Sequence, residues 1–278
     1  MRASPWLLGV TVLVLAAGCG TGSHPASTAL PKARDLVPND LRQAGVLVVG
    51  SDETYAPMEF VKDGKVVGFD VDLAGAVAGK LGLRLDFQSQ NFGDLIGLVN
   101  AGKITTAMSS MTDKASRQSK VTFVDYLNVG SSIVVHKDAA DVAGYRGLCG
   151  LRIGGQPDTF YVDVLNETAA ACPAGHKLTP VVTKDPVGAM RAKQIDAYVN
   201  DYPLAAYDVE NDPSLRISGE QIEAAPYGMA VDKGRHDIAK ALQAALYELI
   251  DDGTYDQLVK TWKLPDGSLK TGALNGGA

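Results

Sequence analysis

Histidine, cysteine and serine are the side chains that most often carry catalysis or bind metals, and their spacing in this sequence predicts neither role. The four histidines are scattered and share no ligand spacing with cysteines or acids. They are His24, His136, His176 and His236. There is no phosphate loop and no G-x-S-x-G elbow, and Lys270-Thr271-Gly272 lacks the S-x-x-K partner of a β-lactamase site. We therefore expect no metal and no cofactor.

The first residues have the composition of an export signal. Arg2 precedes an apolar run over 6–17, which is too short to span a bilayer and suits the apolar region of a signal peptide. The run ends in small residues directly before Cys19, a pattern that resembles a bacterial lipoprotein signal. We expect a signal peptide over 1–18 and a lipid on Cys19, which would anchor the protein to the outer face of the cytoplasmic membrane. An ordinary cleaved secretory signal is the alternative.

Residues 19–40 are rich in Gly, Ser, Thr, Pro and Ala and show no hydrophobic period. Such a segment buries too little apolar surface to fold by itself, so we expect a flexible tether. No later segment is apolar over about 18 residues, so no further membrane span is expected.

The other two cysteines, Cys149 and Cys172, flank one predicted strand–helix unit. In an exported protein this arrangement favours a disulfide between them, with two buried free thiols as the alternative.

Composition limits the class of partner. The chain has 278 residues, 46% of them hydrophobic, and a net charge of -6. This length suits two compact lobes or one large domain. An acidic balance without a basic cluster argues against nucleic acid, because phosphate binding needs local positive charge.

Short apolar runs alternate with helical patterns at the spacing of βαβ units. Strands are predicted near 46–49, 85–87, 107–108, 133–135, 151–153, 181–182, 197–199 and 229–231. Helices are predicted over 68–81, 95–99, 238–249 and, after a break at Gly253, up to Trp262. We expect an α/β fold with two successive units, each a mostly parallel sheet with helices on both faces.

Several stretches in this order resemble the polar amino-acid solute-binding proteins of ABC importers, an extracellular family (family 3). They are 50–60 with 68–74, 108–112 with 117–123, 194–201, and 252–262. The resemblance implies a two-lobed, periplasmic-binding-protein-like fold of type II, with two hinge strands and a ligand cleft between the lobes. It implies lobe one over 41–131 plus 228–264, lobe two over 132–227, and a tail over 265–278, which the Gly-rich composition predicts to be frayed.

The resemblance also implies which side chains hold the two charges of a free amino acid. Arg117 matches the arginine that binds the carboxylate, and a guanidinium fork can hold both oxygens. The Ser110 amide and the Thr112 amide or hydroxyl would complete that cradle. Asp201 matches the partner of the ammonium, with Thr112. Without the resemblance, Arg117 would be a solvated loop charge and Asp201 a helix cap before Pro203.

The remaining matched residues surround the ligand side chain. Tyr55 and Phe92 match two aromatic positions that sandwich it, although Phe92 alone would suit the core. Asp52 matches the acidic position that meets a polar or cationic group, with a turn cap as its alternative.

Further ligand contacts are implied at Ser109 and in the lobe-two loop that carries Gln156, Thr159 and Phe160. Family members usually have glycine just before that threonine, whereas this chain has Asp158.

The acidic residues Asp52, Glu53 and Asp158 favour a cationic or neutral ligand side chain by charge complementarity. We therefore expect arginine, lysine, ornithine or histidine, with glutamine second. The implied partners are an ABC permease and its ATPase, with the binding protein acting as a monomer. A cyclohexadienyl-type dehydratase on the same fold and an extracellular sensor subunit are the alternatives, and no leftover acid–base pair supports the enzyme.

Overall fold

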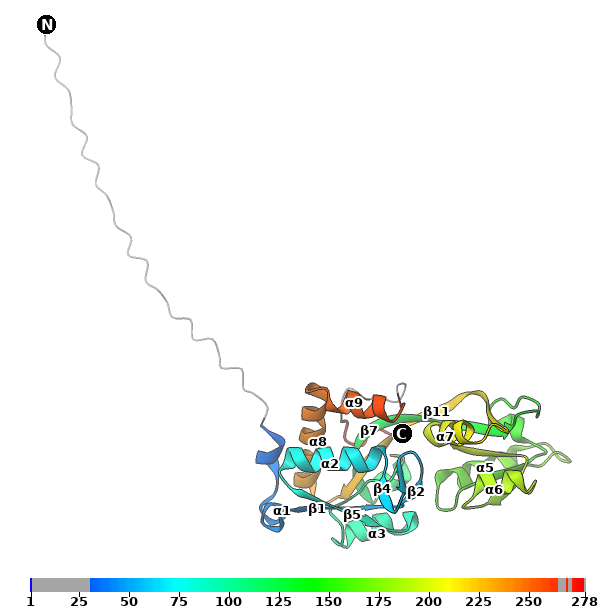
Figure 1. The fold of residues 1–278 in the computed structure, drawn as a ribbon, viewed down its shortest axis with the longest axis horizontal. Helices are drawn as coiled ribbons and strands as arrows, with labels where there is room; N and C mark the ends of the chain where they lie inside the picture. Colours follow the sequence, from blue (N-terminus) through cyan, green and yellow to red (C-terminus); the bar gives the residue numbers. More distant parts are fainter. Residues whose placement is uncertain (2–30, 265–268, 270–271, 278) are drawn as a thin grey trace. The chain divides into compact units, whose positions relative to one another are not determined.

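The computed structural model describes Met1, residues 31–264, Leu269 and residues 272–277 (Figure 1). The expected signal peptide, Cys19 and the tether up to residue 30 lie outside the described residues, as do 265–268, 270–271 and 278.

The strands are β1 (Val46–Ser51), β2 (Thr54–Tyr55), β3 (Glu59–Lys62), β4 (Lys65–Val67), β5 (Arg84–Ser89), β6 (Thr106–Ala107), β7 (Val121–His136), β8 (Arg152–Gly155), β9 (Thr179–Val182), β10 (Ala197–Asp201) and β11 (Leu215–Asp232). The α-helices are α1 (Asn39–Ala44), α2 (Phe69–Leu81), α3 (Leu95–Asn100), α4 (Ala115–Gln118), α5 (Phe160–Ala171), α6 (Pro186–Arg191), α7 (Tyr202–Asn211), α8 (His236–Asp251) and α9 (Thr254–Thr261). Short 3-10 helices are η1 (Ala33–Leu36), η2 (Phe92–Asp94) and η3 (Tyr145–Leu148).

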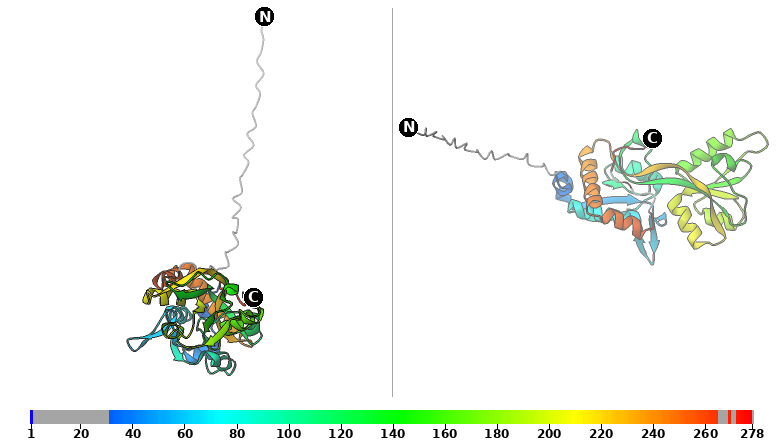
Figure 2. Two further views of the ribbon diagram at one scale, coloured as in Figure 1. Left: turned by 90° about the vertical axis from the view of Figure 1, so that its right-hand side faces the viewer. Right: turned by 90° about the horizontal axis from the view of Figure 1, so that it is seen from above.

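One mixed sheet runs through both lobes in the order β5-β1-β6-β11-β7-β10-β8-β9. In lobe one, β1 pairs in parallel with β5 and β6; in lobe two, β8 pairs in parallel with β9 and β10. The parallel pairing expected for each unit is therefore present, but the two central strands, β7 and β11, are antiparallel. They cross from one lobe to the other in Figure 1 and in the right-hand view of Figure 2.

The two crossing strands are the longest strands of the described chain. β7 has 16 residues, nearly all of them buried, and at about 3.3 Å per residue such a strand extends roughly 50 Å, which is enough to serve both lobes. Its partner β11 has 18 residues and register shifts near its middle, between Ser218 and Tyr227. These two strands are the connection between lobes that the resemblance implied.

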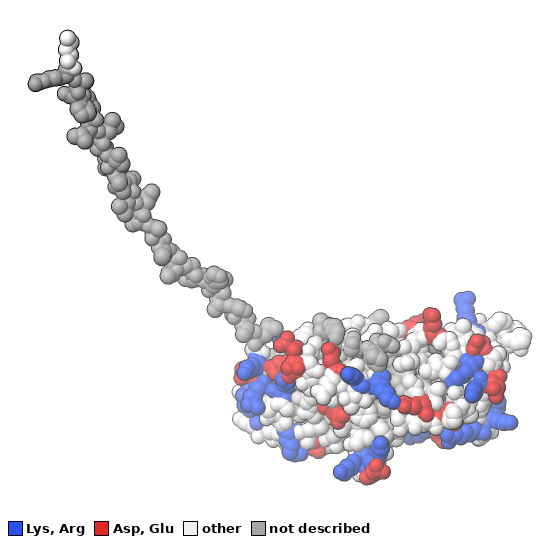
Figure 3. Space-filling model, turned by 45° about the horizontal axis from the view of Figure 1, so that its top comes forward, with Lys and Arg blue, Asp and Glu red and all other residues white. Residues whose placement is uncertain are grey.

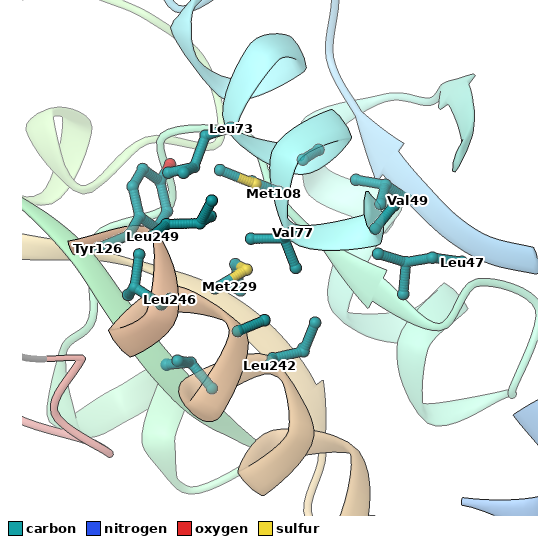
Figure 4. Packing of buried hydrophobic residues seen from close by; sticks show 14 of the residues in the cluster. Leu47, Val49, Leu73, Val77, Met108, Tyr126, Met229, Leu242, Leu246 and Leu249 are labelled. Carbon is teal, nitrogen blue, oxygen red and sulfur yellow. The ribbon is translucent and has the colours of Figure 1, made fainter. Parts of the chain in front are cut away.

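The lobe-one core lies between the sheet and helices α2 and α8 (Figure 4). Leu47 and Val49 of β1 point into this layer because alternate residues of a strand face the same side. The helical stripe of α8 supplies Leu242, Leu246 and Leu249. On the opposite face, α3 packs Leu95 and Val99 against β6, β7 and β11. The strands of lobe one whose ends carry the cleft residues are therefore held by helices on both faces of the sheet.

Lobe two is built from β8, β9 and β10 with α5, α6 and α7, and it has its own apolar clusters on either side of the sheet. The disulfide favoured by the sequence is present, with the Cα atoms of Cys149 and Cys172 5.6 Å apart. It joins the end of η3 to the end of α5, the helix whose first residues line the cleft.

The sequence predicts a tether up to residue 40, but the folded body already begins near residue 31. Ala33, Val37 and Leu41 are buried in the lobe-one core, and the Ala33 amide donates to Glu248 of α8 at 2.7 Å. These apolar residues recur every four positions, so one side of η1 and α1 is apolar although the surrounding composition is polar.

The tail expected to be frayed is also partly ordered, since Gly272–Gly277 lies along β7. The Asp125 amide donates to Ala273 O at 2.9 Å, and the Asn275 amide donates to Phe123 O at 3.1 Å. The glycines that suggested fraying allow this close approach, because a Cβ on Gly277 would collide with the backbone of Asp113.

This tail segment rests on two buried carboxyl groups, each of which accepts a backbone amide at 2.9 Å: Asp125 from Gly276 and Asp113 from Gly277. Burial, and then the charge of Asp113, raises the pKa of Asp125 from 3.8 to about 7. Asp125 therefore keeps its proton in the folded state at pH values where the unfolded chain, which releases it at about pH 4, has already lost it. Since folding binds this proton, stability falls as the pH rises from about 4 through about 7.

Asp125→Asn should flatten that decline, because the amide keeps an acceptor for Gly276 and carries no charge. We expect the variant to be more stable than wild type at about pH 8, on the order of 1 to 3 kcal/mol, with a smaller gain near about pH 5. Urea unfolding at both pH values measures the difference. Parallel pH profiles of the two proteins would contradict the assignment.

Basic and acidic side chains are interspersed over the face drawn in Figure 3. Within the described ranges, no helix combines the length and apolar character needed to cross a bilayer.

Candidate ligand-binding cleft

A cavity of about 830 Å³ is lined by residues of both lobes. It lies where β1, β6, β8 and β10 end, as sites in open α/β sheets generally do. Every residue that the resemblance assigned to the ligand lines it: Asp52, Tyr55, Phe92, Ser109, Ser110, Thr112, Arg117, Gln156, Thr159, Phe160 and Asp201.

Arg117 enters the cavity from α4, the short helix before β7. Its Nη1 donates to the Thr112 carbonyl at 3.0 Å, and its guanidinium lies 5.3 Å from the centre of the Phe92 ring. Burial lowers the pKa of Arg117, while the charge of Asp201 opposes that shift; the group stays cationic, since arginine does not deprotonate in proteins. Among the described residues it has no carboxylate within ion-pair distance.

Asp201 ends β10 on the lobe-two side and is 5% exposed. Its carboxylate accepts the hydroxyls of Tyr161 and Tyr55, each at 2.6 Å. Burial raises the pKa of Asp201, and the hydroxyls of Tyr161, Tyr227 and Tyr55 counteract that shift. The side chain makes no capping hydrogen bond to α7, so the helix-cap alternative does not describe it.

Tyr55 brings the two lobes into direct contact at this point. It belongs to β2 of lobe one, and its hydroxyl bonds both Asp201 and Asn200 of lobe two, the latter at 2.8 Å. Lys114 makes a second contact across the lobes, 3.6 Å from Asp163 of α5. The cavity is therefore bounded by both lobes in this conformation.

The turn that carries Ser109 and Ser110 is held by hydrogen bonds to two acidic side chains. The Ser110 amide, expected to reach a ligand carboxylate, donates instead to Asp70 at 2.8 Å. The Ser109 hydroxyl donates to Glu59 at 3.0 Å. Ser110 has φ 49, a left-handed conformation that costs a non-glycine residue on the order of 1 kcal/mol. These contacts offset that strain, while Thr112 of the same turn contacts Arg117 through its carbonyl.

Asp52 lines the cavity and also caps its own loop. One carboxylate oxygen accepts the Thr54 hydroxyl at 2.7 Å, and the other accepts the Phe92 amide at 3.1 Å. The turn-cap alternative is thus part of its role. Since a carboxylate has about four acceptor positions, Asp52 retains capacity for a ligand cation.

The lobe-two loop departs from the family pattern at Asp158, which adopts φ 62. Glycine takes this conformation freely, whereas Asp is one of the few other residues that tolerate it. Its carboxyl lies opposite lobe one, 3.2 Å from where a Cβ on Gly93 would be. Behind it, the Thr159 hydroxyl donates to Gln156 O at 2.7 Å.

Several cavity residues were not anticipated. Glu59 lies inside a matched stretch, and its sequence signal was an acid between the apolar Met58 and Phe60. Tyr161 had no local signal, because its reach to Asp201 depends on how α5 packs. Lys184 comes from the loop after β9.

The cavity carries an excess of negative charge. Its acidic residues are Asp52, Glu53, Glu59, Asp94, Asp158 and Asp201, and its basic residues are Arg117 and Lys184. Across the described chain, no three His, Cys, Asp or Glu side chains are grouped to hold a metal ion.

Sequence relatives share most of the chain's length. The arginine-binding protein ArgT of Corynebacterium glutamicum is 30% identical over 254 residues, which are 88% of this chain and 83% of ArgT. The L-cystine-binding protein TcyJ of Escherichia coli is 27% identical over 262 residues, 92% of this chain and 94% of TcyJ. Both are named as binding proteins rather than enzymes.

Solved structures confirm the expected two-lobed fold. An ancestral arginine-binding protein bound to arginine superimposes with a TM-score of 0.74 at 31% identity, covering 78% of this chain and 98% of its own. Residues 47–265 match the sequence profile of one family. Together with the shared fold, this match shows that the chain belongs to the bacterial extracellular solute-binding proteins, family 3.

Proposed function

We propose that this protein captures a free amino acid with a cationic side chain and delivers it to an ABC importer. The observation that carries the proposal is that Arg117 and Asp201 line one cavity from opposite lobes. A buried carboxylate or ammonium without a partner is costly, so this pair suits the two charges of an amino acid backbone.

The remaining cavity charges favour a basic ligand side chain. Once Arg117 and Asp201 are assigned to the backbone charges, Lys184 is the remaining basic residue of the cavity, and its remaining acidic residues are Asp52, Glu53, Glu59, Asp94 and Asp158. Such a surface attracts arginine, lysine, ornithine or histidine and disfavours glutamate. The relative ArgT, which is named an arginine-binding protein, supports a basic ligand. We place glutamine second.

Capture would proceed by closure of the lobes. A ligand held by both Arg117 and Asp201 binds the closed form better than the open form, and therefore shifts the population toward closure. β7 and β11, which connect the lobes, are the elements that would bend.

The expected lipid on Cys19 would keep the binding protein beside its permease and ATPase at the outer face of the membrane. Radiolabelled palmitate should be incorporated by wild type and not by Cys19→Ser. Equal labelling, or none in either protein, would contradict the anchor while leaving the ligand proposal intact.

A thermal-shift screen of the standard amino acids plus ornithine and citrulline tests the ligand class, since a ligand that binds the native state raises its melting temperature. We expect the largest shifts with arginine, lysine, ornithine or histidine, and calorimetric titration then gives the affinity. Tight glutamate binding without a response to basic amino acids would overturn the proposal.

Asp52 should discriminate between charged and neutral ligands. In Asp52→Asn the amide oxygen can still cap the Phe92 amide, but the negative charge is lost. We expect about tenfold weaker binding of arginine and nearly unchanged binding of glutamine. Calorimetric titration of both ligands gives the ratio, and equal losses would remove Asp52 from the specificity role.

A further inference from the structure

Beneath the cavity lies a pair of acidic side chains to which the ligand scheme gives no role. Glu59 of β3 and Asp70 of α2 are both 0% exposed, and Glu59 also lines the cavity. Glu59 accepts the hydroxyls of Ser109 at 3.0 Å and Ser110 at 3.4 Å. Both acids therefore contact the turn that leads to Thr112 and Arg117.

The hydrogen bonds of Asp70 point to a proton between the two groups. Its Oδ2 accepts the Ser110 amide and the Tyr126 hydroxyl, both at 2.8 Å. Its Oδ1 is buried and meets no donor among the described residues, yet the Glu59 carboxyl lies within hydrogen-bonding reach. Two carboxylates cannot hydrogen-bond to each other, so a proton on one of them satisfies the unpaired oxygen.

The surroundings of the pair favour keeping that proton. Burial, and then Asp70, raises the pKa of Glu59 well above its usual range. Burial also raises the pKa of Asp70 to about 6, against hydrogen bonds from Tyr126 and Ser110. The other charged group that faces Glu59 is Asp52, a further carboxylate, while the phenols of Tyr55 and Tyr126 have raised pKa values and stay neutral.

A continuous series of contacts leads from this pair to the ligand groups. The Ser109 hydroxyl that donates to Glu59 also accepts the Asp52 amide at 3.0 Å. Ser110 holds its left-handed conformation over Asp70. Two residues further on, the Thr112 carbonyl accepts from Arg117 at 3.0 Å. A displaced turn would therefore move the guanidinium.

We propose that Glu59 and Asp70 share one proton and, as positioning residues, hold the turn 109–112 so that Arg117 points at the ligand carboxylate. Release of the proton would place two negative charges in one buried site and disturb the turn. Ligand affinity would then fall as the pH rises. This inference rests on the proposed function.

The test is calorimetric titration with L-arginine between about pH 5 and about pH 8.5, in wild type, Glu59→Gln and Asp70→Asn. We expect wild-type affinity to fall about tenfold over this range. Each amide variant leaves the pair with one ionisable carboxyl, so its affinity should vary less than about threefold over this range. A flat wild-type profile, or variants that follow the wild-type profile, would overturn the proposal.

Asp63→Asn is the matched control, because Asp63 is an exposed carboxyl at the turn between β3 and β4, outside the cavity. It should keep the full wild-type pH dependence. Glu59→Ala removes the acceptors of both serine hydroxyls and should bind arginine about tenfold more weakly throughout the range. Unchanged affinity in Glu59→Ala would show that the pair does not position the turn.

Ligand-free unfolding separates this inference from the proposed function. Because the folded state holds the shared proton, wild-type stability should fall with rising pH, and Glu59→Gln should fall less steeply. If no amino acid binds to wild type, the proposed function fails and this stability comparison decides whether the proton is shared. Identical slopes in the two proteins would then overturn the shared proton.

Discussion

Replacing Arg117 by alanine should abolish measurable amino-acid binding while the protein stays folded. The ligand carboxylate would enter a buried site without a cation, and removing one partner of such a pair costs about 4 kcal/mol, or on the order of 1000-fold in affinity. Thermal-shift and calorimetric titration with arginine measure the loss.

The fold should tolerate this change because Arg117 has no ion pair among the described residues. Burial disfavours its charge, so the ligand-free melting temperature should stay within a few degrees of wild type. Arg117→Lys keeps a charge but loses the fork, and should bind with intermediate affinity. Arg146→Ala, an exposed residue of η3, is the control and should bind like wild type. Normal affinity in Arg117→Ala would mean that the ligand lies elsewhere.

Local patterns in the sequence were sufficient for most of the strands, but among the described α-helices only for α2, α3, α8 and α9. The apolar run at β1 and the helical stripe of α8 lie where the periodicity predicted them, because the apolar pattern of each is contained in its own short segment. β7 was recognised only near Ile133–Val135 and is actually 16 residues long. A strand buried on both faces shows no alternation, so its extent depends on contacts with the second lobe.

The errors at the two ends of the body have a similar cause. Composition suggested flexibility in both segments, through the prolines and polar residues of 31–40 and the glycines of 272–277, yet both are packed. Composition reports what a segment can bury by itself, whereas these segments are ordered by the surface beneath them. The Gly277 amide, for example, meets the buried Asp113.

Site residues were identified more readily than their contacts. Arg117 and Asp201 came from matched motifs, and both line the cavity. The direction of the Ser110 amide could not be deduced, because it depends on a left-handed backbone and on Asp70, 40 residues away. Motifs specify residue types, while hydrogen-bond partners follow from packing between distant elements.

Replacing Asp201 by asparagine should separate ligand binding from stability. The amide oxygen can still accept a hydroxyl from Tyr161 or Tyr55, so the hydrogen-bonded group at the end of β10 keeps its shape. It no longer offers a charge to the ligand ammonium, and affinity for arginine should fall by on the order of 100-fold to 1000-fold.

The stability of ligand-free Asp201→Asn should rise or stay constant, most clearly above neutral pH. Burial raises the pKa of Asp201, so ionising it costs free energy of folding as the pH increases. Urea unfolding at about pH 5 and about pH 8 measures this cost, and Asp208→Asn is a matched control, since burial also raises its pKa, to about 6, outside the cavity. Asp208→Asn should gain stability without losing affinity for arginine. If Asp201→Asn were less stable than wild type and still bound arginine with normal affinity, Asp201 would be a structural residue. The proposal requires the opposite, namely a buried charge that lowers the stability of the ligand-free fold and is retained because it binds the ligand.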